Sequence, residues 1–440
     1  MDNKHANELT AVILAGGKGV RLNSITKDEI PKPMAAICGK PILEHIVDRL
    51  KENGITRIFM MVGHLYNKIV DYFGDGHKFG VSIEYVIEQQ PLGSGGGLFF
   101  LKDKVKTDFL VCSGDTVLDV DVERMYRYHL EHQAQITMFT HPNAHPYDSD
   151  LVVTDANNRV TGIDKKGGIR DYCYHNNVNA SFVIADNSTL QYFDELRKIN
   201  LEHDFITHFI GLGSVYAYNS SEYIKDVGTP ERFVSAELDI LQGLPQKLNL
   251  KNKQKAVFLD RDGTVNKYKG FIRSADEIEL LDGVAEAVKL LNKSDYLAVI
   301  VSNQPVIARG EASFGDVEDM FKKIETLLGR EGAYIDGYFY CPHHPDKGYA
   351  GEIAELKIKC GCRKPNIGLL LQASERFNLD LSQCVMIGDG NIDVLTAKNA
   401  GIPSVKVKTG IIEECSCQAD YEADDLLEAV RIVLNGVKTK

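Results

Sequence analysis

The sequence predicts an α/β protein made of two doubly wound domains, each a sheet covered by helices on both faces. Three observations predict this. The 440 residues are too many for one ordinary hydrophobic core. Short apolar runs alternate with amphipathic stretches in both halves, as in βαβ proteins. Between the halves, residues 242–255 hold turn residues and lysines without hydrophobic periodicity. We therefore expect domains at 8–245 and 256–436, joined by a linker at 246–255.

Each expected strand is an apolar run of strand length with turn residues or an amphipathic stretch on either side. In the first half these runs are 10–16, 55–63, 82–88, 109–115 and, near the end, 214–218. Residues 41–53 repeat apolar positions at helical spacing and are expected to form a helix. In the second half the runs are 256–259, 297–301, 337–340, 384–387 and 404–407.

Composition narrows the functional class. The chain is 44% hydrophobic and 25% charged, which is typical of globular proteins, and no apolar run approaches the roughly 18 residues of a membrane span. A net charge of -12 at pH 7 disfavours a nucleic-acid surface. Nine cysteines, an odd number, favour reduced thiols, and the polar N-terminus is unlike a signal peptide. We expect a cytoplasmic protein with small-molecule partners, without nucleic-acid or membrane partners; a homo-oligomer is compatible with the sequence.

A glycine-rich loop, Leu14-Ala15-Gly16-Gly17-Lys18-Gly19-Val20-Arg21, follows the first strand. Its glycines let backbone N–H groups approach phosphate oxygens where a Cβ would clash. The spacing fits neither the dinucleotide fingerprint nor the P-loop, and an isolated glycine turn is most often structural. Arg21 and the extended Pro31-Lys32-Pro33-Met34 segment add positive charge. The pattern predicts a nucleoside triphosphate site with contacts from Leu14, Gly16, Gly17, Gly19 and Arg21.

This combination resembles the sugar-nucleotide pyrophosphorylases, which transfer a nucleotidyl group from a nucleoside triphosphate to a sugar 1-phosphate. The resemblance covers about residues 10 to 240 and implies a Rossmann-like nucleotidyltransferase domain. Residues 88–96, Glu-Gln-Gln-Pro-Leu-Gly-Ser-Gly-Gly, are similar to the family's base-contacting loop, which implies nucleotide contacts from Gln90 and Gly93.

Two further motifs are similar to the metal-binding positions of that family: Ser113-Gly114-Asp115 and Asp226-Val227-Gly228-Thr229-Pro230. They imply Mg²⁺ bound by Asp115 and Asp226, since this cation prefers carboxylate and phosphate oxygens. In the implied reaction a sugar phosphate oxygen attacks the α-phosphorus, so the protein orients and neutralises charge. Arg21 would stabilise the departing pyrophosphate and Lys32 would clamp the reacting phosphates; both are candidate catalytic residues.

Two departures from the family lie in regions that face the sugar. Asp164-Lys165-Lys166 stands where the family often has Glu-Lys-Pro, and Asn179-Ala180-Ser181 stands where it has Asn-Ala-Gly. Lys165 and Asn179 are the candidate sugar-binding residues, but hexose specificity is not carried over. A rival interpretation is a regulatory module that binds nucleotide sugars without turnover; the presence of Arg21, Lys32, Asp115 and Asp226 argues against it.

Carboxylates follow two apolar strands of the second half. Asp260 and Asp262 lie in Phe258-Leu259-Asp260-Arg261-Asp262-Gly263-Thr264, and Asp389 follows the strand at 384–387, with Asp393 one helical turn further on. Adjacent carboxylates repel one another unless a cation neutralises them. The pattern predicts a second Mg²⁺ site, with Asp260, Asp262 and Asp389 as ligands.

These motifs resemble the haloacid dehalogenase superfamily of phosphatases over about residues 256 to 430, which implies a haloacid dehalogenase-like domain. The resemblance implies that Asp260 is the nucleophile that forms an aspartyl phosphate. Asp262 would be the general acid for the leaving alcohol and then the base for water. Ser302 would hydrogen-bond the transferring phosphoryl group and Lys364 would neutralise it. The candidate substrate-binding residues are Ser302, Asn303 and Lys364.

Cys341-Pro342-His343 and Cys360-Gly361-Cys362 offer three thiolates and an imidazole, a set suited to closed tetrahedral Zn²⁺. We predict a structural zinc site with ligands Cys341, His343, Cys360 and Cys362, and His344 as an alternative. Followed by Arg363-Lys364-Pro365, this loop narrows the resemblance to the heptose bisphosphate phosphatases, which share it with histidinol phosphatases. Arg363 would then grip the distal phosphate of a doubly phosphorylated sugar. Gly390 departs from that family, which usually has Lys there.

The two resemblances together imply a bifunctional enzyme of nucleotide-activated heptose biosynthesis. Removal of the 7-phosphate from D-glycero-D-manno-heptose 1,7-bisphosphate yields heptose 1-phosphate, the class of acceptor that the first domain needs. The product is expected to be GDP-linked, by similarity to the guanylyltransferases of that pathway. The alternative is a hexose 1-phosphate nucleotidyltransferase fused to a histidinol-phosphate or other small-molecule phosphatase. The nucleotide base, the anomer, the oligomeric state and channelling stay open.

Overall fold

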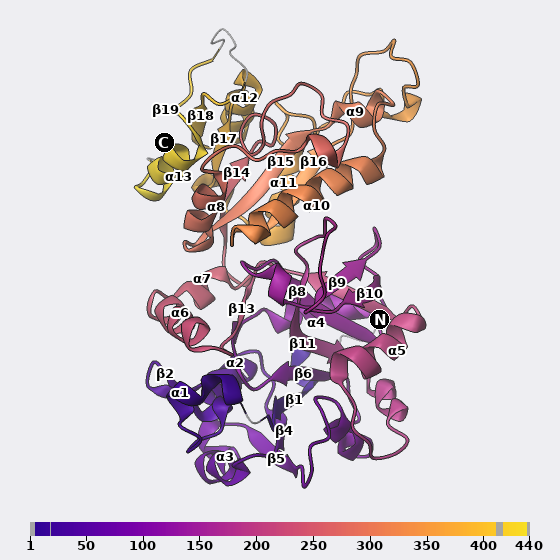
Figure 1. Cartoon of the computed structure of the whole chain (residues 1–440), viewed down its shortest axis with the longest axis vertical. Helices are drawn as coiled ribbons and strands as arrows, with labels where there is room; N and C mark the ends of the chain where they lie inside the picture. The colour runs from indigo at the N-terminus through magenta and orange to yellow at the C-terminus, as the bar shows by residue number, and fades with distance from the viewer. Residues whose placement is uncertain (1–4, 18, 411–416, 438–440) are drawn as a thin grey trace. The chain divides into compact units, whose positions relative to one another are not determined.

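The computed structural model describes residues 5–17, 19–410 and 417–437 (Figure 1). By its internal contacts the chain divides into two compact units. Unit 1 consists of the chain up to His141, Asp150–Lys165 and Asn177–Asn249. Unit 2 consists of Pro142–Ser149, Lys166–Asn176 and the chain from Leu250 onward. Two short segments from within the first expected domain therefore belong to the second unit.

A mixed sheet of nine strands forms the centre of unit 1. The strands of this unit are β1 (Thr10–Ala15), β2 (Ala36–Ile37), β3 (Lys40–Pro41), β4 (Arg57–Val62), β5 (Ser82–Ile87), β6 (Phe109–Ser113), β7 (Thr116–Asp119), β8 (Ile136–His141), β9 (Leu151–Thr154), β10 (Val160–Asp164), β11 (Val178–Ala185), β12 (Val215–Asn219) and β13 (Tyr223–Asp226). Seven strands follow the order β10-β9-β11-β6-β1-β4-β5, and β8 pairs with β11 and β12. Strands β6, β1, β4 and β5 run parallel, whereas β11 is antiparallel to β6.

The helices of unit 1 contribute apolar residues to the two hydrophobic cores of this unit. They are α1 (Asn23–Thr26), α2 (Ile42–Glu52), α3 (Tyr66–Phe73), α4 (Val122–Glu131), α5 (Thr207–Gly211), α6 (Pro230–Leu241) and α7 (Leu244–Leu248), with one π-helical turn, η8 (Leu201–Ile206). In α2 the buried residues Ile42, Ile46 and Leu50 recur at helical spacing, so they form a single apolar stripe. Helix α6 begins where Thr229 accepts a hydrogen bond from the Arg232 backbone N–H, with proline at its first position.

The expected strands at 10–16, 55–63, 82–88 and 109–115 coincide with β1, β4, β5 and β6 to within two residues. Three of them, β1, β4 and β6, are almost fully buried, which is why they read as continuous apolar runs. Strands β9 and β10 are partly exposed and lack such a run, so the sequence pattern did not reveal them. The alternation of strands and helices predicted a parallel sheet; with β9, β10 and β11 the sheet is mixed.

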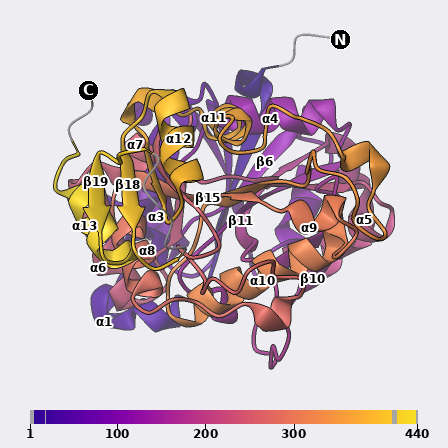
Figure 2. The ribbon, with the colours of Figure 1, turned by 90° about the horizontal axis from the view of Figure 1, so that it is seen from above.

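Unit 2 has a six-stranded sheet in the order β16-β15-β14-β17-β18-β19, parallel throughout. Its strands are β14 (Lys255–Leu259), β15 (Tyr296–Asn303), β16 (Gly337–Cys341), β17 (Val385–Gly388), β18 (Ser404–Val407) and β19 (Tyr421–Ala423). Its helices are α8 (Val284–Asn292), α9 (Pro305–Ala308), α10 (Phe314–Arg330), α11 (Gly368–Phe377), α12 (Asn391–Ala400) and α13 (Leu426–Leu434). Helices α8, α10 and α13 share one core with the sheet, and α10 lies on the opposite side of β15 from α11 and α12 (Figure 2). Ser313 starts α10 with a capping box to Asp316.

Both sheets contain a topological switch point, where ligands bind in open α/β sheets. In unit 1 the chain passes from β1 to β4 and β5 on one side and then returns to β6 on the other. In unit 2 it passes from β14 to β15 and β16 and then returns to β17. The carboxyl ends of β1 and β6, and those of β14 and β17, therefore border a crevice in each unit.

The expected linker at 246–255 contains the end of α7 and the first residue of β14. Within unit 2, the side chain of Asn378 donates hydrogen bonds to the carbonyls of Leu250, at 2.8 Å, and Asn252, at 3.1 Å. Hydrogen bonds thus fix the backbone at Leu250 and Asn252, in the middle of the expected linker. Among the described residues, no helix is long and apolar enough to cross a membrane.

Candidate active sites

A cavity of about 770 Å³ opens at the switch point of unit 1. The glycine-rich loop after β1 borders it, together with residues that follow β5 and β6. The sequence-predicted residues that line this cavity are Leu14, Gly16, Gly17, Gly19, Arg21, Lys32, Gln90, Gly93 and Asp115. Lys18 lies outside the described residues. Folding thus brings predicted phosphate-binding, base-contacting and metal-binding residues around one space.

Close approaches explain the glycines at two positions of this region, Gly19 in the loop and Gly114 after β6. Gly19 has φ +63°, and a Cβ there would lie 2.5 Å from the Cβ of Lys32. Gly114 donates its backbone N–H to the carbonyl of Leu14 at 2.9 Å, and a Cβ there would lie 3.0 Å from that oxygen. The loop can therefore pack against Lys32 and the end of β6 only with glycine at these positions.

Lys32 and Asp115 form an ion pair in the cavity wall. The Lys32 side chain is 8% exposed and its Nζ contacts Asp115 Oδ2, while Ser113 Oγ donates to Asp115 Oδ1 at 2.5 Å. Burial would raise the pKa of Asp115, but the charge of Lys32 and the two hydrogen bonds outweigh it and lower the pKa below its ordinary value. Asp115 is thus held as a carboxylate, the form that binds a divalent cation.

Asp226 lies beside this pair but is not part of the cavity lining. Its carboxylate pairs with Arg232 and accepts a hydrogen bond from the Gly228 N–H at 2.7 Å. The next residue, Val227, donates its backbone N–H to the carbonyl of Asp115 at 3.0 Å, which links the two predicted metal positions. A Cβ on Gly228 would lie 3.4 Å from both Arg21 Nη2 and Lys32 Nζ, so the two predicted cations converge here.

The two predicted sugar-binding residues do not line the cavity. Lys165 is exposed to solvent. Asn179 instead accepts a hydrogen bond from the Ser181 N–H at 3.1 Å through its side-chain oxygen. Ser181 and Glu202 do line the cavity, and sequence reasoning did not select either as a site residue. The departure from glycine at position 181 was the one available signal for Ser181, and no motif marks Glu202.

Three carboxylates and a lysine meet at the switch point of unit 2. Carboxylate oxygens of Asp260, Asp389 and Asp393 lie within 4.8 Å of one another, an arrangement that could hold a metal ion. Lys364 Nζ donates to Asp260 Oδ1 at 2.5 Å and to Asp393 Oδ1 at 2.6 Å, and its side chain is 2% exposed. One cation therefore faces three acidic groups. The cluster fits Mg²⁺, which would supply the missing positive charge.

The pKa values of this cluster reflect burial and mutual repulsion. Burial raises the pKa of Asp260, and the nearby Asp393 and Asp262 raise it further, against the opposing effect of Lys364. Burial would lower the pKa of Lys364, but the charges of Asp260 and Asp393 outweigh burial and raise it. Lys364 is thus a permanent cation placed beside the predicted nucleophile.

Asp262 is not part of this group of carboxylates. Its carboxylate pairs with Arg261, whose Nη2 lies 2.8 Å away, and accepts a hydrogen bond from Asn266 Nδ2 at 3.0 Å. Gln304 Nε2 lies 3.3 Å from Asp262 and donates to the buried Ser302 Oγ at 2.7 Å. The structure therefore groups Asp393 with Asp260 and Asp389, two of the predicted metal ligands, and metal binding by Asp262 stays a prediction.

Asn303 contacts the backbone of Lys364 at two points. Its side-chain oxygen accepts the Lys364 N–H at 2.9 Å, and its amide donates to the Lys364 carbonyl at 3.1 Å. The end of β15 thus fixes the backbone that carries the lysine. Asn303 thus positions Lys364, and its predicted contact with substrate stays a prediction.

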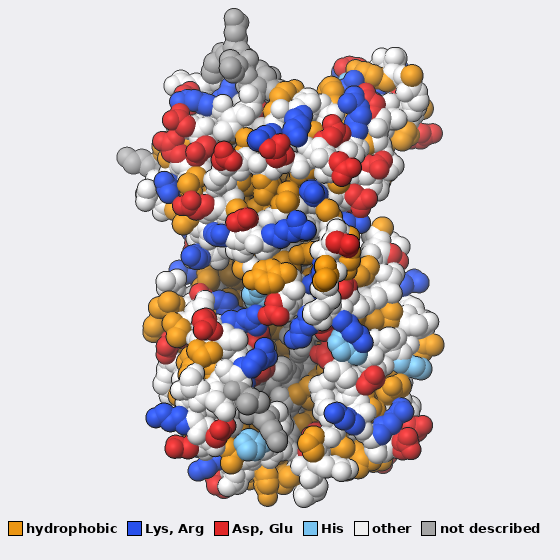
Figure 3. Space-filling model, viewed as in Figure 1, with side chains coloured by type: hydrophobic (Ala, Val, Ile, Leu, Met, Phe, Trp, Pro, Cys, Tyr) orange, Lys and Arg blue, Asp and Glu red, His pale blue; other side chains and the backbone are white. Residues whose placement is uncertain are grey.

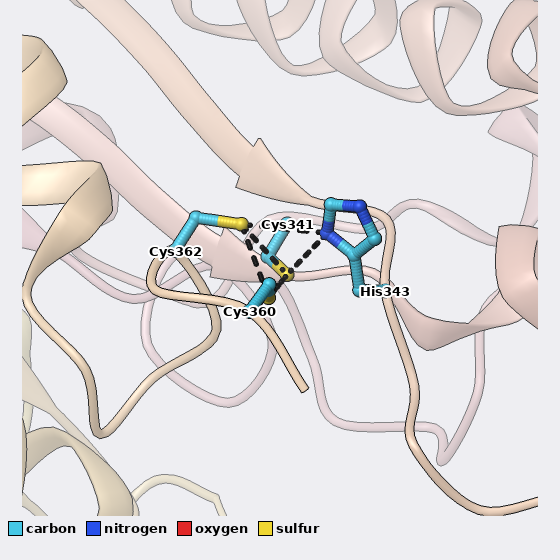
Figure 4. Close-up of side chains that lie close together, drawn as sticks. All are labelled: Cys341, His343, Cys360 and Cys362. Carbon is cyan, nitrogen blue, oxygen red and sulfur yellow. Dashed lines mark hydrogen bonds between the residues drawn. The ribbon is translucent and has the colours of Figure 1, made fainter. Parts of the chain in front are cut away.

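The four predicted zinc ligands form a compact cluster (Figure 4). The three Sγ–Sγ distances are 3.3 to 3.5 Å, and His343 Nδ1 lies 3.5 Å from Cys341 Sγ and 3.4 Å from Cys362 Sγ. Zinc with Zn–S bonds of about 2.3 Å has ligand atoms about 3.8 Å apart, so a small expansion would accommodate the ion. His344, the alternative ligand, lies outside the cluster.

The predicted zinc cluster also contacts Arg363, the residue predicted to bind a distal phosphate. The Arg363 backbone N–H donates to Cys360 Sγ at 3.3 Å, and its guanidinium donates to the carbonyl of His343 at 3.1 Å. Lys364 is the next residue. A metal bound by the cysteines would therefore fix the segment that carries both cationic groups.

Similarity to known proteins agrees with this geometry. Residues 10–243, more than half of the chain, match the family model described as nucleotidyl transferase, and residues 361–431 match the HAD-hydrolase-like model. The D-glycero-beta-D-manno-heptose-1,7-bisphosphate 7-phosphatase of Haemophilus ducreyi is 39% identical over 184 residues, which are 41% of this chain and 98% of that protein. The chain belongs to both families: it joins a nucleotidyl transferase to a heptose-bisphosphate phosphatase. It is a bifunctional enzyme.

Two further similarities concern the nucleotidyl transferase domain. Mannose-1-phosphate guanylyltransferase of Mycobacterium tuberculosis is 29% identical over 241 residues, which are 54% of this chain and 66% of that protein. The crystal structure of HddC from Yersinia pseudotuberculosis superposes with a TM-score of 0.47 and 26% identity, over 53% of this chain and 99% of that one.

Charged side chains of both signs are present on the face drawn in Figure 3. On this face, the described acidic and basic side chains are interspersed and form no continuous basic stripe.

Proposed function

We propose that the phosphatase domain removes the 7-phosphate of a heptose 1,7-bisphosphate and that the nucleotidyl transferase domain couples the resulting heptose 1-phosphate to a nucleotide, with GTP as the donor. The observation that carries the proposal is the buried group of Asp260, Lys364 and Asp393 in a domain 39% identical to a heptose-bisphosphate phosphatase along nearly its whole length. The product of this domain is an acceptor of the class that sugar-1-phosphate transferases use.

In the phosphatase domain, an Asp260 carboxylate oxygen attacks the 7-phosphorus, and the ester bond to the sugar oxygen breaks. Asp262 gives its proton to that oxygen, then takes one from the water that hydrolyses the aspartyl phosphate and releases inorganic phosphate. Because Asp262 is paired with Arg261 in the structure, this role requires its side chain to turn towards Asp260 when substrate binds. Lys364 neutralises the phosphoryl oxygens, and Mg²⁺ held by Asp260, Asp389 and Asp393 would supply further positive charge.

In the nucleotidyl transferase domain, an oxygen of the sugar 1-phosphate attacks the α-phosphorus of the nucleotide, and the bond to the β-phosphate oxygen breaks to release pyrophosphate. Arg21 and Lys32, which converge near Gly228, would hold the phosphates in line. Asp115, kept ionised by Lys32 and Ser113, and the neighbouring Asp226 would bind Mg²⁺ once phosphates draw Lys32 away. Zn²⁺ at the cysteine cluster would have a structural role.

The full chain, given heptose 1,7-bisphosphate, GTP and Mg²⁺, should release phosphate first and pyrophosphate second, with a nucleotide heptose as the product. Both anomers of the bisphosphate should be supplied, because the phosphatase relative is named for the beta form. Absence of any nucleotide sugar with every triphosphate would contradict the proposal.

Mannose 1-phosphate is a second candidate acceptor, favoured by the similarity to the mannose-1-phosphate guanylyltransferase. A comparison of kcat/KM for heptose 1-phosphate and mannose 1-phosphate, with the same triphosphate, decides between them. A kcat/KM a hundredfold higher for mannose 1-phosphate would show that mannose 1-phosphate, and not heptose 1-phosphate, is the acceptor. The assignment of the phosphatase domain would not change.

A further inference from the structure

Ser181 has an unusual backbone conformation for its residue type. It lies within β11 at a point where the pairing with β8 shifts register between Asn179 and Val183, and its φ is +50°. A residue with a Cβ is strained in this left-handed conformation, which glycine adopts freely. Such strain persists where surrounding contacts impose it, and it is concentrated at functional sites. Ser181 lines the cavity of the nucleotidyl transferase domain.

The side chain of Ser181 holds a carboxylate in the same cavity. Ser181 Oγ donates to Glu202 Oε1 at 3.0 Å, and Glu202 also lines the cavity. Glu202 belongs to the π-helical turn η8, a rare geometry that is frequent at functional sites. The Asn200 side chain begins this turn by accepting the backbone N–H groups of Glu202, at 3.0 Å, and His203, at 2.7 Å. Glu202 is therefore fixed through both its backbone and its carboxylate.

The segment before Glu202 is joined to the predicted base-contacting loop. Gly95 donates its N–H to the carbonyl of Ile199 at 2.9 Å, and Leu201 donates its N–H to Ser94 Oγ at 2.8 Å. A Cβ on Gly93 would lie 2.3 Å from the carbonyl oxygen of Ile199, so only glycine permits this contact. The nucleotide-facing loop and the turn that carries Glu202 thus form one connected part of the cavity wall.

The negative charge of a carboxylate determines which chemical groups of the substrates Glu202 can bind. The same cavity contains Arg21 and Lys32, which suit phosphate, whereas a carboxylate repels it. An ionised carboxylate is an acceptor-only group with about four lone-pair sites. Ser181 occupies one of them, and the remaining sites suit hydroxyl donors. Neighbouring hydroxyl groups of a sugar are the substrate feature that matches this surface.

We propose that Glu202 binds the hydroxyl groups of the sugar 1-phosphate acceptor and that Ser181 is the positioning residue that orients the Glu202 carboxylate. This inference rests on the proposed transfer to a sugar 1-phosphate and identifies the residues that recognise the sugar. The Asn179 side chain, which does not line the cavity, accepts a hydrogen bond from the Ser181 N–H and so helps to fix the backbone of Ser181. The hydroxyl donor of Ser181 offsets the backbone strain that its side chain causes.

The Ser181→Gly substitution, made in the whole chain, distinguishes an effect on sugar binding from an effect on protein stability. Glycine removes the strain, so the melting temperature should stay unchanged or rise, while loss of the hydrogen bond to a charged group should raise the KM for sugar 1-phosphate about tenfold or more. The KM for the nucleoside triphosphate should stay within twofold. Glu202→Gln should raise the same KM at least as much. Glu195→Gln, which alters an exposed carboxylate outside the cavity lining, is the matched control.

Titration calorimetry of sugar 1-phosphate into each variant measures recognition without turnover. If the wild type forms a nucleotide sugar but Ser181→Gly and Glu202→Gln bind the sugar phosphate as it does, this inference is wrong and the proposed function stands. If the wild type transfers nothing yet binds sugar 1-phosphate in a way that Glu202→Gln weakens, the recognition pair stands and the proposed transfer is wrong. Equal weakening by the Glu195→Gln control would also overturn the inference.

Discussion

The hydroxyl of Thr326 in helix α10 contacts both backbone groups of Tyr174, a residue 152 positions earlier in the chain. It accepts the Tyr174 N–H at 2.9 Å and donates to the Tyr174 carbonyl at 3.2 Å. Thr326 is 1% exposed. Tyr174 belongs to Lys166–Asn176, a segment between β10 and β11 of the nucleotidyl transferase sheet. The compact unit that contains the phosphatase domain thus includes a piece of chain contributed by the first half of the sequence.

Thr326→Val should destabilise this unit. Valine keeps the shape of threonine but removes the hydroxyl that bonds the N–H and the carbonyl of Tyr174, and a typical hydrogen bond contributes about 0.5–1.5 kcal/mol to stability. The melting temperature of the full chain, followed by calorimetry, should fall by several degrees. Thr326→Ser, which keeps the hydroxyl, should recover most of the loss. An unchanged melting temperature in the valine variant would show that the segment does not depend on this contact.

His175 should make the same segment sensitive to pH. Burial lowers the pKa of His175, but the hydrogen bond to Glu325 at 2.6 Å and the charges of Glu325 and Glu318 outweigh both burial and the opposing Lys322, and they raise the pKa. A raised folded-state pKa means that the stabilisation is fully present below the ordinary value of about 6.5 and is lost as pH rises through the folded value.

The melting temperature should therefore fall more between pH 6 and pH 9 in the wild type than in His175→Gln, which cannot carry the charge. The difference between the two proteins should be largest at pH 6. A difference that is the same at both pH values would mean that the charge of His175 does not contribute.

The two chemical centres should respond separately to mutation. Asp260→Asn removes the proposed nucleophile and should reduce phosphate release by at least a thousandfold, with transfer to heptose 1-phosphate intact. Lys32→Ala should reduce transfer by a hundredfold or more and leave phosphate release unchanged. Assays of both products in each variant test this. Joint loss of both activities from either change would show that the sites depend on one another.

Loss of the zinc cluster should impair the phosphatase and spare the transferase. Cys360→Ser weakens the proposed site and removes the thiol that accepts the Arg363 N–H, so the segment with Arg363 and Lys364 should become less ordered. Metal analysis should find one zinc per wild-type chain and much less in the variant. The KM for bisphosphate should rise at least fivefold. Cys112→Ser, at a buried thiol outside the zinc cluster, controls for general effects of removing a cysteine. Stoichiometric zinc in the Cys360→Ser protein would refute the ligand set.

The residues of each site that belong to one short motif could be predicted from the sequence. Asp260 and Asp389 could be recognised because each directly follows a buried strand, and parallel strands place their carboxyl ends at the same edge of a sheet. The zinc ligands could be recognised because two short Cys/His pairs offer a suitable donor set. The orientation of the Asp262 side chain could not be predicted from the sequence, because its carboxylate forms an ion pair with the neighbouring Arg261.

The order of apolar runs, the glycine-rich loop and the acidic motifs determined by themselves that this protein has two α/β parts and two phosphate chemistries, since each signal lies within a few neighbouring residues. Only the tertiary structure decided that Ser181 meets Glu202, that Asp393 joins Asp260, and that Tyr174 packs on Thr326. The partners in these three pairs are 21 to 152 residues apart in the sequence. Periodicity shows which face of an element is buried, but which faces meet depends on how the whole chain packs.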